Sequence, residues 1–301
     1  MIKIDLITGF LGSGKTTFII KYAKYLMSLG ERVCILENDY GAVNIDMMLL
    51  SEIGCDREMI AGGCDYDCHQ RRFKTKLINM ALMGYSRIIV EPSGIFDTDE
   101  FFDLLYEQPL DSLYEIANVF SLYDINTNNL SYESRYILAS QISVSSKIIV
   151  SKRDNSKEAL NIDYLNNIME EFNCPRIITN DDIIYNDNLN FNNILNSGHK
   201  SYSHIKIPIN NDNKYDSIYF LDKPFNKDII LKIKDELFKD SSYGNIARIK
   251  GFIKENDIWY RINITKNESD FSQISNGQNV LIIIGENLNN DLINNFVNKM
   301  I

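Results

Sequence analysis

Residues 9–16 read Gly-Phe-Leu-Gly-Ser-Gly-Lys-Thr, which matches the phosphate-binding pattern Gly-x-x-x-x-Gly-Lys-Ser/Thr. The stretch follows a short apolar run, residues 2–7, that is typical of a buried strand. Residues 15–29 have the pattern of a helix that ends at Gly30. A strand, a glycine loop and a helix in this order predict a P-loop that binds a nucleoside triphosphate, with an ordinary glycine-rich turn as the alternative.

Each residue type in this loop has a chemical reason to be there. Glycines let successive backbone N–H groups converge on phosphate oxygens, and the N-terminus of the following helix adds its partial positive charge. Lys15 is expected to neutralise the terminal phosphates during catalysis, and Thr16 to bind Mg²⁺. The nucleotide-binding residues predicted in this stretch are Gly9, Gly12, Ser13, Gly14, Lys15, Thr16 and Thr17.

The composition indicates a globular protein of two domains, because 301 residues exceed the usual size of one domain and 45% of them are hydrophobic. The net charge of −10 and the lack of a long Lys/Arg run argue against a nucleic-acid partner. No stretch approaches the roughly 18 uninterrupted apolar residues of a membrane span, so we expect no membrane partner and a cytoplasmic location. Five cysteines in such a chain favour free thiols or metal ligands over disulfides.

Strand and helix patterns alternate through the first two thirds of the chain. Strand patterns cover residues 32–37, 87–91, 118–124 and 147–152. Helical patterns cover residues 68–83, 131–141 and 156–172. This alternation predicts an α/β fold, in which residues 1–200 form a P-loop domain with a mostly parallel, helix-covered sheet. Residues 180–203 are rich in Asn, Asp and Ser, which is typical of a linker or a domain edge.

The last third of the chain, residues 201–301, has a different mixture of patterns. Its strand candidates are residues 204–208, 217–221, 245–254, 258–264 and 279–284. Its helix candidates are residues 226–238 and 288–300. This mixture predicts a smaller α+β domain.

The segment Ser-Lys-Arg-Asp at residues 151–154 follows a strand pattern and is similar to the guanine-reading Asn-Lys-x-Asp of GTPases. The Asp154 carboxylate can accept hydrogen bonds from N1–H and the 2-amino group of guanine, a donor pair that adenine does not present. The stem of Lys152 can cover the face of the base. Ser151, Lys152 and Asp154 are therefore predicted to read guanine, with a charged turn after a strand as the alternative.

Two further strand patterns end in acids. Glu91 closes one of them and Pro-Ser-Gly follows, so that Glu91 can hold Mg²⁺ and the N–H of Gly94 can face the γ-phosphate. Glu37 and Asp39 lie at the end of the strand that follows the first helix. Because strand ends meet at one edge of a parallel sheet, we expect Thr16, Glu37 and Glu91 to form the magnesium site. Solvated strand-end acids are the alternative.

Residues 63–69 read Gly-Cys-Asp-Tyr-Asp-Cys-His and bring soft and borderline metal ligands together. Cys64, Cys68 and His69, completed by Asp39 or another ligand, suit tetrahedral Zn²⁺. Asp67 is expected to cap the helix that follows, which would stabilise a thiolate at Cys68. Free thiols with a solvated histidine, or an iron–sulfur cluster shared across a dimer, are the alternatives. The cysteines at positions 34, 55 and 174 are expected to be structural.

These motifs in this order resemble the CobW-like family of GTP-dependent metallochaperones, which are P-loop GTPases with a CobW C-terminal domain. Gly-Phe-Leu-Gly-Ser-Gly-Lys-Thr-Thr at 9–17 matches the family's loop. Glu-Asn-Asp-Tyr-Gly at 37–41 and Glu-Pro-Ser-Gly at 91–94 are similar to its Glu-Asn-Glu-Phe-Gly and Glu-Thr-Ser-Gly segments. In the second domain, Arg-Ile-Lys-Gly-Phe at 248–252 and Leu-Ile-Ile-Ile-Gly at 281–285 look like its C-terminal strands.

The resemblance implies slow hydrolysis of GTP to GDP and phosphate, with Mg²⁺, coupled to delivery of Zn²⁺ or Co²⁺. The partner would be a client metalloenzyme or a protein of a cofactor pathway, and a homodimer is an open option. The family's metal motif is Cys-x-Cys-Cys, whereas here Cys64 is followed by Cys68 and His69. A GTPase that activates a cofactor-dependent enzyme and carries no metal is therefore an alternative function. A phosphotransferase that uses the same loop is a third.

Overall fold

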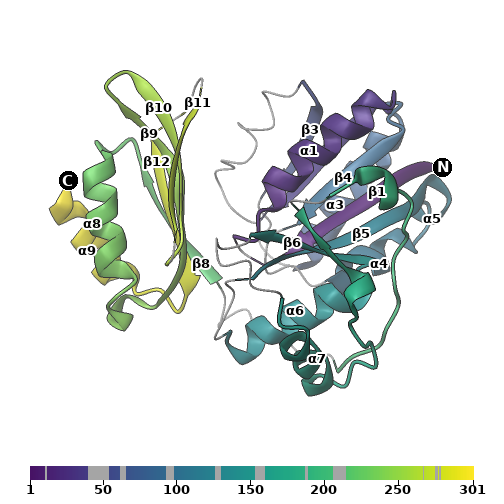
Figure 1. Ribbon diagram of the computed structural model, residues 1–301. Helices are drawn as coiled ribbons and strands as arrows, with labels where there is room; N and C mark the ends of the chain where they lie inside the picture. Colours follow the sequence, from purple (N-terminus) through teal and green to yellow (C-terminus); the bar gives the residue numbers. More distant parts are fainter. Residues whose placement is uncertain are drawn as a thin grey trace. The chain divides into compact units, whose positions relative to one another are not determined.

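The structure, a computed structural model, describes residues 1–10, 12–39, 54–61, 66–92, 98–125, 130–152, 160–186, 189–205, 215–266, 268–274, 277 and 279–301. For residues 38, 39, 61, 66–69, 100, 152, 215 and 216 it describes the backbone alone. The chain divides into two compact units, Met1–Ile207 and Pro208–Ile301 (Figure 1). Among the helices of the described residues, none has both the length and the apolar character that crossing a membrane requires.

The first unit is built on a seven-stranded sheet with the strand order β3-β2-β4-β1-β5-β6-β7, in which every neighbouring pair is parallel. The strands are β1 (Ile2–Gly9), β2 (Val33–Asp39), β3 (Asp56–Ala61), β4 (Arg87–Pro92), β5 (Tyr114–Asp124), β6 (Lys147–Lys152) and β7 (Ile183–Tyr185). The P-loop strand β1 lies between β4 and β5 in the middle of the sheet. The carboxyl ends of β1, β2, β4 and β6 therefore face the same edge, where ligands of such sheets bind.

Helices cover both faces of this sheet, as Figure 1 shows. They are α1 (Lys15–Ser28), α3 (Tyr66–Ala81), α4 (Thr98–Leu105), α5 (Leu110–Leu113), α6 (Tyr132–Val144) and α7 (Ile162–Glu171). On one face, α1 buries Phe18, Ile19 and Leu26 in a cluster with strand residues. On the other face, Phe73 of α3 and Phe101 of α4 join a second cluster. This arrangement confirms the predicted α/β fold with a parallel, helix-covered sheet.

The second unit is a five-stranded antiparallel sheet with two helices. Its strands are β8 (Tyr215–Leu221), β9 (Asn245–Glu255), β10 (Ile258–Ile264), β11 (Ser269–Ile274) and β12 (Val280–Glu286), in the order β11-β10-β9-β12-β8. Helices α8 (Lys227–Leu237) and α9 (Asn290–Met300) bury Ile233 and Val297 in one hydrophobic cluster with the sheet. The predicted α+β character of this part is confirmed.

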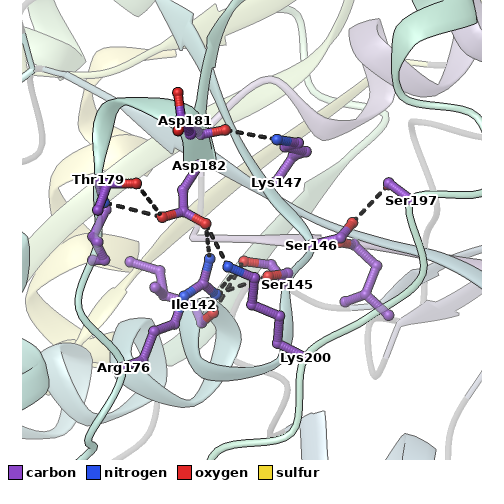
Figure 2. Close-up of polar contacts among 12 residues, drawn as sticks. Ile142, Ser145, Ser146, Lys147, Arg176, Thr179, Asp181, Asp182, Ser197 and Lys200 are labelled. Atoms are coloured by element: carbon purple, nitrogen blue, oxygen red, sulfur yellow. Dashed lines mark hydrogen bonds and ion pairs between the residues drawn. The ribbon is translucent and has the colours of Figure 1, made fainter.

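A cluster of ion pairs and hydrogen bonds links residues 176–200, near the end of the first unit, to the amino end of β6 (Figure 2). Asp182, at the end of a 3₁₀ turn (η1, Asn180–Asp182), accepts hydrogen bonds from Arg176 at 3.1 Å and from Lys200 at 2.6 Å. Arg176 also donates to the carbonyl oxygens of Ile142 in the last turn of α6 and of Ser145, which follows that helix. The Arg176 and Asp182 side chains are 0% and 8% exposed, whereas that of Lys200 is 34% exposed, so the pair of Arg176 and Asp182 is the buried part of this cluster.

The sequence pattern predicts a linker or a domain edge at residues 180–203, and the described residues contradict the linker, whereas β7 is the last strand in the order of the sheet. The segment contains η1, the strand β7 and a second 3₁₀ turn, η3 (Phe191–Asn193), and β7 pairs with β6. Its polar side chains are used in specific bonds, since the backbone N–H of Ser197 donates to Asn118 Oδ1 at 2.8 Å. Residues 204 and 205 of the predicted strand at 204–208 form no strand, and the rest of that strand lies outside the described residues.

Several boundaries also differ from expectation. Helix α3 begins at Tyr66, so Asp67 lies inside its first turn and is not the residue that caps it. Strand β5 begins four residues earlier than predicted, and β3, α4 and β11 are elements that the sequence pattern did not indicate. Strand β3 has no continuous apolar run, because positions 56–58 are charged, and an edge strand does not need such a run. The apolar pattern therefore does not indicate it.

Candidate nucleotide-binding site

The loop between β1 and α1 adopts a backbone that only glycine tolerates well. Gly9, Gly12 and Gly14 have φ values of 141°, 80° and 88°. A Cβ on Gly9 would lie 2.4 Å from the carbonyl oxygen of Leu122, so the loop packs directly against β5. The glycines at these places are thus needed for both the turn and the close packing.

The N-terminus of α1 is suited to an anion. Gly14 is the N-cap residue in the left-handed conformation, no side chain caps the helix, and no acid lies in its first turn. The hydroxyl of Ser13 is buried and has no hydrogen-bond partner in the described part of the chain. Lys15 is buried and donates to the carbonyl oxygen of Gly9 at 2.8 Å. Backbone N–H groups, a buried hydroxyl and a buried ammonium group together fit a phosphate chain.

Two acids lie side by side on the neighbouring strands β2 and β4, and one of them, Glu91, bonds to the first turn of α1. Glu37 of β2 and Glu91 of β4 are register partners in the parallel ladder and are 2% and 8% exposed. Thr16 Oγ1 donates to Glu91 Oε1 at 3.0 Å. Buried carboxylates beside each other and beside a hydroxyl are hard oxygen donors, so these three residues fit Mg²⁺. Thr17, the next residue of α1, is exposed.

The predicted guanine-reading strand end also reaches the phosphate loop. The Cβ of Ser151 would lie 3.3 Å from a Cβ placed on Gly14, and the Ser151 hydroxyl donates to the carbonyl oxygen of Tyr123 at 3.3 Å. Lys152 ends β6, and its side chain is not among those described. Asp154 and Gly94 lie outside the described residues. Their roles stay predictions.

The predicted ligands of a transported metal lie mostly beyond the described side chains. Cys64 is outside the described residues, while Cys68 and His69 are in the first turn of α3 and Asp39 ends β2, each with a described backbone alone. Among the side chains that the structure does describe, no three from His, Cys, Asp and Glu form a group able to hold a metal ion.

Burial explains why two other thiols are poor metal ligands. It raises the pKa of Cys34 to about 12 and that of Cys55 to about 11, so both stay protonated near neutral pH. Both side chains are buried in the hydrophobic clusters of the first unit. They therefore act as packed side chains, as the sequence led us to expect.

A buried polar network beneath α1 was missed from the sequence. Asp5 of β1 accepts from Arg87 of β4 at 2.9 Å, from Asn118 of β5 at 2.8 Å and from the Tyr22 hydroxyl of α1 at 3.1 Å. Asp5 and Asn118 are 0% exposed. The network ties the helix that follows the phosphate loop to three strands. Its signal in the sequence is a charged residue inside an apolar strand run, which requires a buried partner.

Comparison with known proteins places this geometry in a family. A family model described as "CobW/HypB/UreG, nucleotide-binding domain" matches residues 3–180. The zinc chaperone YeiR of Escherichia coli is 35% identical over 106 residues, which is 35% of this chain and 32% of YeiR. The zinc chaperone YjiA of the same organism is 23% identical over 167 residues, 52% of this chain and 51% of YjiA. The chain thus aligns with about a third to a half of the length of these curated relatives.

A solved structure, that of the Zn(II)-bound YjiA GTPase from E. coli, covers 100% of this chain and 99% of its own, with 14% identity and a TM-score of 0.41. The family model spans more than half of the chain and includes every strand from β1 to β6. This protein therefore belongs to the CobW/HypB/UreG family, of which it carries the nucleotide-binding domain.

Proposed function

We propose that the chain is a GTPase that couples its nucleotide state to the binding of a metal ion and its delivery to a client protein. The observation that carries this proposal is the meeting of Thr16, Glu91 and Glu37 beside the glycine loop, in a chain of the CobW/HypB/UreG family. The names of two relatives, both zinc chaperones, support zinc as the transported ion. We also propose a cytoplasmic location and two functional domains that correspond to the two compact units, whose division after residue 207 lies seven residues beyond the boundary predicted between residues 1–200 and 201–301.

The loop residues would hold the phosphates of GTP. Ser13 and the N–H groups at the start of α1 supply hydrogen-bond donors, and Lys15 supplies charge from a buried position. Binding would require Lys15 to exchange its bond to the Gly9 carbonyl oxygen for phosphate oxygens. Ser151, Lys152 and Asp154 would select guanine, and the position of Ser151 beside Gly14 would place base recognition next to the phosphate loop.

Thr16, Glu37 and Glu91 would hold Mg²⁺. When bound, the ion neutralises charge that develops on the phosphate oxygens during hydrolysis. The protein contributes a rigid oxygen set, because Glu37 and Glu91 are fixed in register within adjacent buried strands. Gly94, three residues beyond Glu91, would contribute its N–H at the γ-phosphate.

Cys64, Cys68 and His69 would bind the zinc ion that is delivered, with Asp39 as a further ligand. The backbone supports coupling to the nucleotide, because Glu37 and Asp39 lie on the same short strand, β2. A change in the position of Glu37 on hydrolysis would then be transmitted to Asp39 along that strand. In the alternative function, the chain is a GTPase that activates another enzyme without carrying metal. Such a protein would have the nucleotide site but not the zinc site.

The nucleotide part is tested by the release of phosphate from GTP and from ATP in the presence of Mg²⁺. We expect hydrolysis of GTP over ATP, loss of that activity in Lys15→Ala, and loss of the preference for GTP in Asp154→Asn. Lys21→Ala, on the exposed side of the same helix, is the matched control and should leave hydrolysis unchanged. Equal rates of GTP hydrolysis in the wild type and in Lys15→Ala would refute the proposed GTPase activity.

The metal part is tested by titration with Zn²⁺ against a competing chelating dye. We expect tight binding that weakens in Cys64→Ala and in Cys68→Ala but not in Cys174→Ala, whose thiol is buried elsewhere in the first unit. Binding that is the same in all four proteins would favour the alternative function without metal, while leaving the GTPase intact.

A further inference from the structure

A groove of about 380 Å³ lies between the edge strand β3 and the helix α3. Its lining includes Met59 and Ile60 of β3 and three cationic residues of α3, Arg71, Arg72 and Lys76. Arg71 and Arg72 are exposed, and Lys76 is half-buried and bonded to Glu58 at 2.8 Å. The groove thus has an apolar end on the strand and a basic wall on the helix.

The charge of this basic wall is opposite in sign to the net charge of the chain. The protein as a whole has a net charge of −10, yet the described lining of the groove holds three cations, and a carboxylate beside it, that of Glu58, pairs with Lys76. A local charge opposite to that of the molecule attracts oppositely charged partners and guides their approach. The chemistry of the groove therefore selects an acidic ligand.

The floor of the groove favours an extended backbone as that ligand. Strand β3 is the last in the sheet order, and it pairs with β2 on one side and with no other strand among those described. An edge strand offers backbone donors and acceptors that an added strand can use. Half-buried Met59 offers an apolar contact at the same place, while Ile60 is buried in the core of the first unit.

The spacing of the cations fits an extended peptide. Arg72 and Lys76 are four residues apart on α3, which is a rise of about 6 Å along the helix. Alternate residues of a strand, which point to the same side, are about 6.6 Å apart. Acids at alternate positions of an added strand would therefore match the spacing of Arg72 and Lys76, and the acid at Lys76 would share that ammonium group with Glu58.

We propose that the β3/α3 groove binds an extended acidic segment of a partner protein, which adds as a strand beside β3 with alternate acidic side chains against α3. A symmetric dimer through β3 is disfavoured, because it would bring the same cations of two copies together. Cys68 and His69 lie one turn before Arg72 on the same helix, so the segment would end next to the predicted zinc ligands. That the partner is the client which receives the metal rests on the proposed function.

The test uses fluorescence anisotropy with a short fluorescein-labelled peptide of alternating Glu and Val and the full-length protein. We expect binding that weakens with salt, and about tenfold weaker binding to the double variant Arg71→Glu/Arg72→Glu. The control variant Lys21→Glu/Lys24→Glu carries the same charge change on exposed positions of α1 and should bind like the wild type. A peptide with N-methyl groups at alternate residues should bind much more weakly, because it cannot complete a strand ladder.

The proposal would be overturned by no binding to the wild type, by equal loss in both double variants, or by equal binding of a peptide with the same composition and all Glu residues together. GTP hydrolysis and Zn²⁺ affinity are measured on the same proteins. If peptide binding follows the expected pattern while hydrolysis or zinc binding is absent, the docking site stands and the proposed function fails. Concentration-dependent self-association that is lost in Arg71→Glu/Arg72→Glu would instead identify a second copy as the occupant and would refute a separate partner.

Discussion

Replacing Asp182 by Asn is expected to weaken the first unit through the charge that it leaves behind. The carboxylate lies 3.1 Å from the guanidinium of Arg176, whose side chain is 0% exposed, and 2.6 Å from the ammonium group of Lys200, which is 34% exposed (Figure 2). Removing one partner of a buried ion pair costs about 3–5 kcal/mol, whereas a pair that reaches solvent contributes less than about 1 kcal/mol.

The lower end of that range applies here. Arg176 keeps its bonds to the carbonyl oxygens of Ile142 and Ser145, and the Asn amide can still accept one bond. We therefore expect a loss of about 3 kcal/mol in the free energy of unfolding at neutral pH. For a unit of this size, that corresponds to a melting temperature lower by about 6–12 °C in scanning calorimetry.

The same substitution has a defined pH dependence. Burial by itself raises the pKa of Asp182, but hydrogen bonds from Lys200 and Thr179 and the charge of Arg176 outweigh it, so the pKa lies well below its usual range. A lowered pKa stabilises the fold fully above the unfolded value of about 4, and the effect is lost as the pH falls below it toward the folded value. The difference in stability between the wild type and Asp182→Asn should therefore shrink between about pH 5 and pH 2.

The neighbouring residue provides the control. Asp181 is exposed, and its backbone oxygen, which the substitution keeps, accepts the bond from Lys147. Asp181→Asn should change the free energy of unfolding by less than about 0.5 kcal/mol. Equal losses in Asp181→Asn and Asp182→Asn, or a difference that persists unchanged at low pH, would refute the reasoning.

Three further substitutions test the candidate nucleotide site. Gly9→Ala should abolish nucleotide binding in calorimetric titration, because the new Cβ would lie 2.4 Å from the Leu122 carbonyl oxygen at a φ of 141°; binding of normal affinity would contradict this packing. Glu91→Gln keeps an acceptor for Thr16 but loses the charge, so stimulation of hydrolysis by Mg²⁺ should fall about tenfold or more, and an unchanged rate would remove Glu91 from the magnesium site. Ser151→Asn should raise the affinity for GDP by about fivefold, which corresponds to the contribution of one hydrogen bond, and should leave the affinity for ADP unchanged. Equal gains in affinity for both nucleotides would argue against recognition of the guanine base by residue 151.

The central elements of the fold could be predicted from local sequence because local chemistry decides them. The glycine loop needs residues without a Cβ, and β6 is an apolar run with clear ends, so its predicted bounds are those observed. The three-residue strand β7 could not be predicted in this way. The strand itself reads Ile-Ile-Tyr, which is too short a run to stand out in a segment otherwise rich in Asn and Asp, and long-range bonds such as that between Ser197 and Asn118 outweigh the segment's local preference for loops.

The candidate site, like the fold, could be predicted from the sequence only in part. Strand ends on a parallel sheet converge by topology, so the meeting of Thr16 with Glu91 could be expected from the order of the motifs. The contact between Ser151 and Gly14 and the network around Asp5 depend on which strands are neighbours in the sheet. Strand order is a property of the whole fold, and no local pattern in the sequence contains it.

The most direct test of a GTPase that delivers metal is the affinity for Zn²⁺ in two nucleotide states. It is measured by dye competition on the full-length protein, once with Mg²⁺ and a non-hydrolysable GTP analogue and once with Mg²⁺ and GDP. Coupling between the sites predicts that the two zinc affinities differ by about fivefold or more, and that Cys68→Ala removes the difference. Equal zinc affinities with the GTP analogue and with GDP would contradict the coupling of hydrolysis to metal delivery.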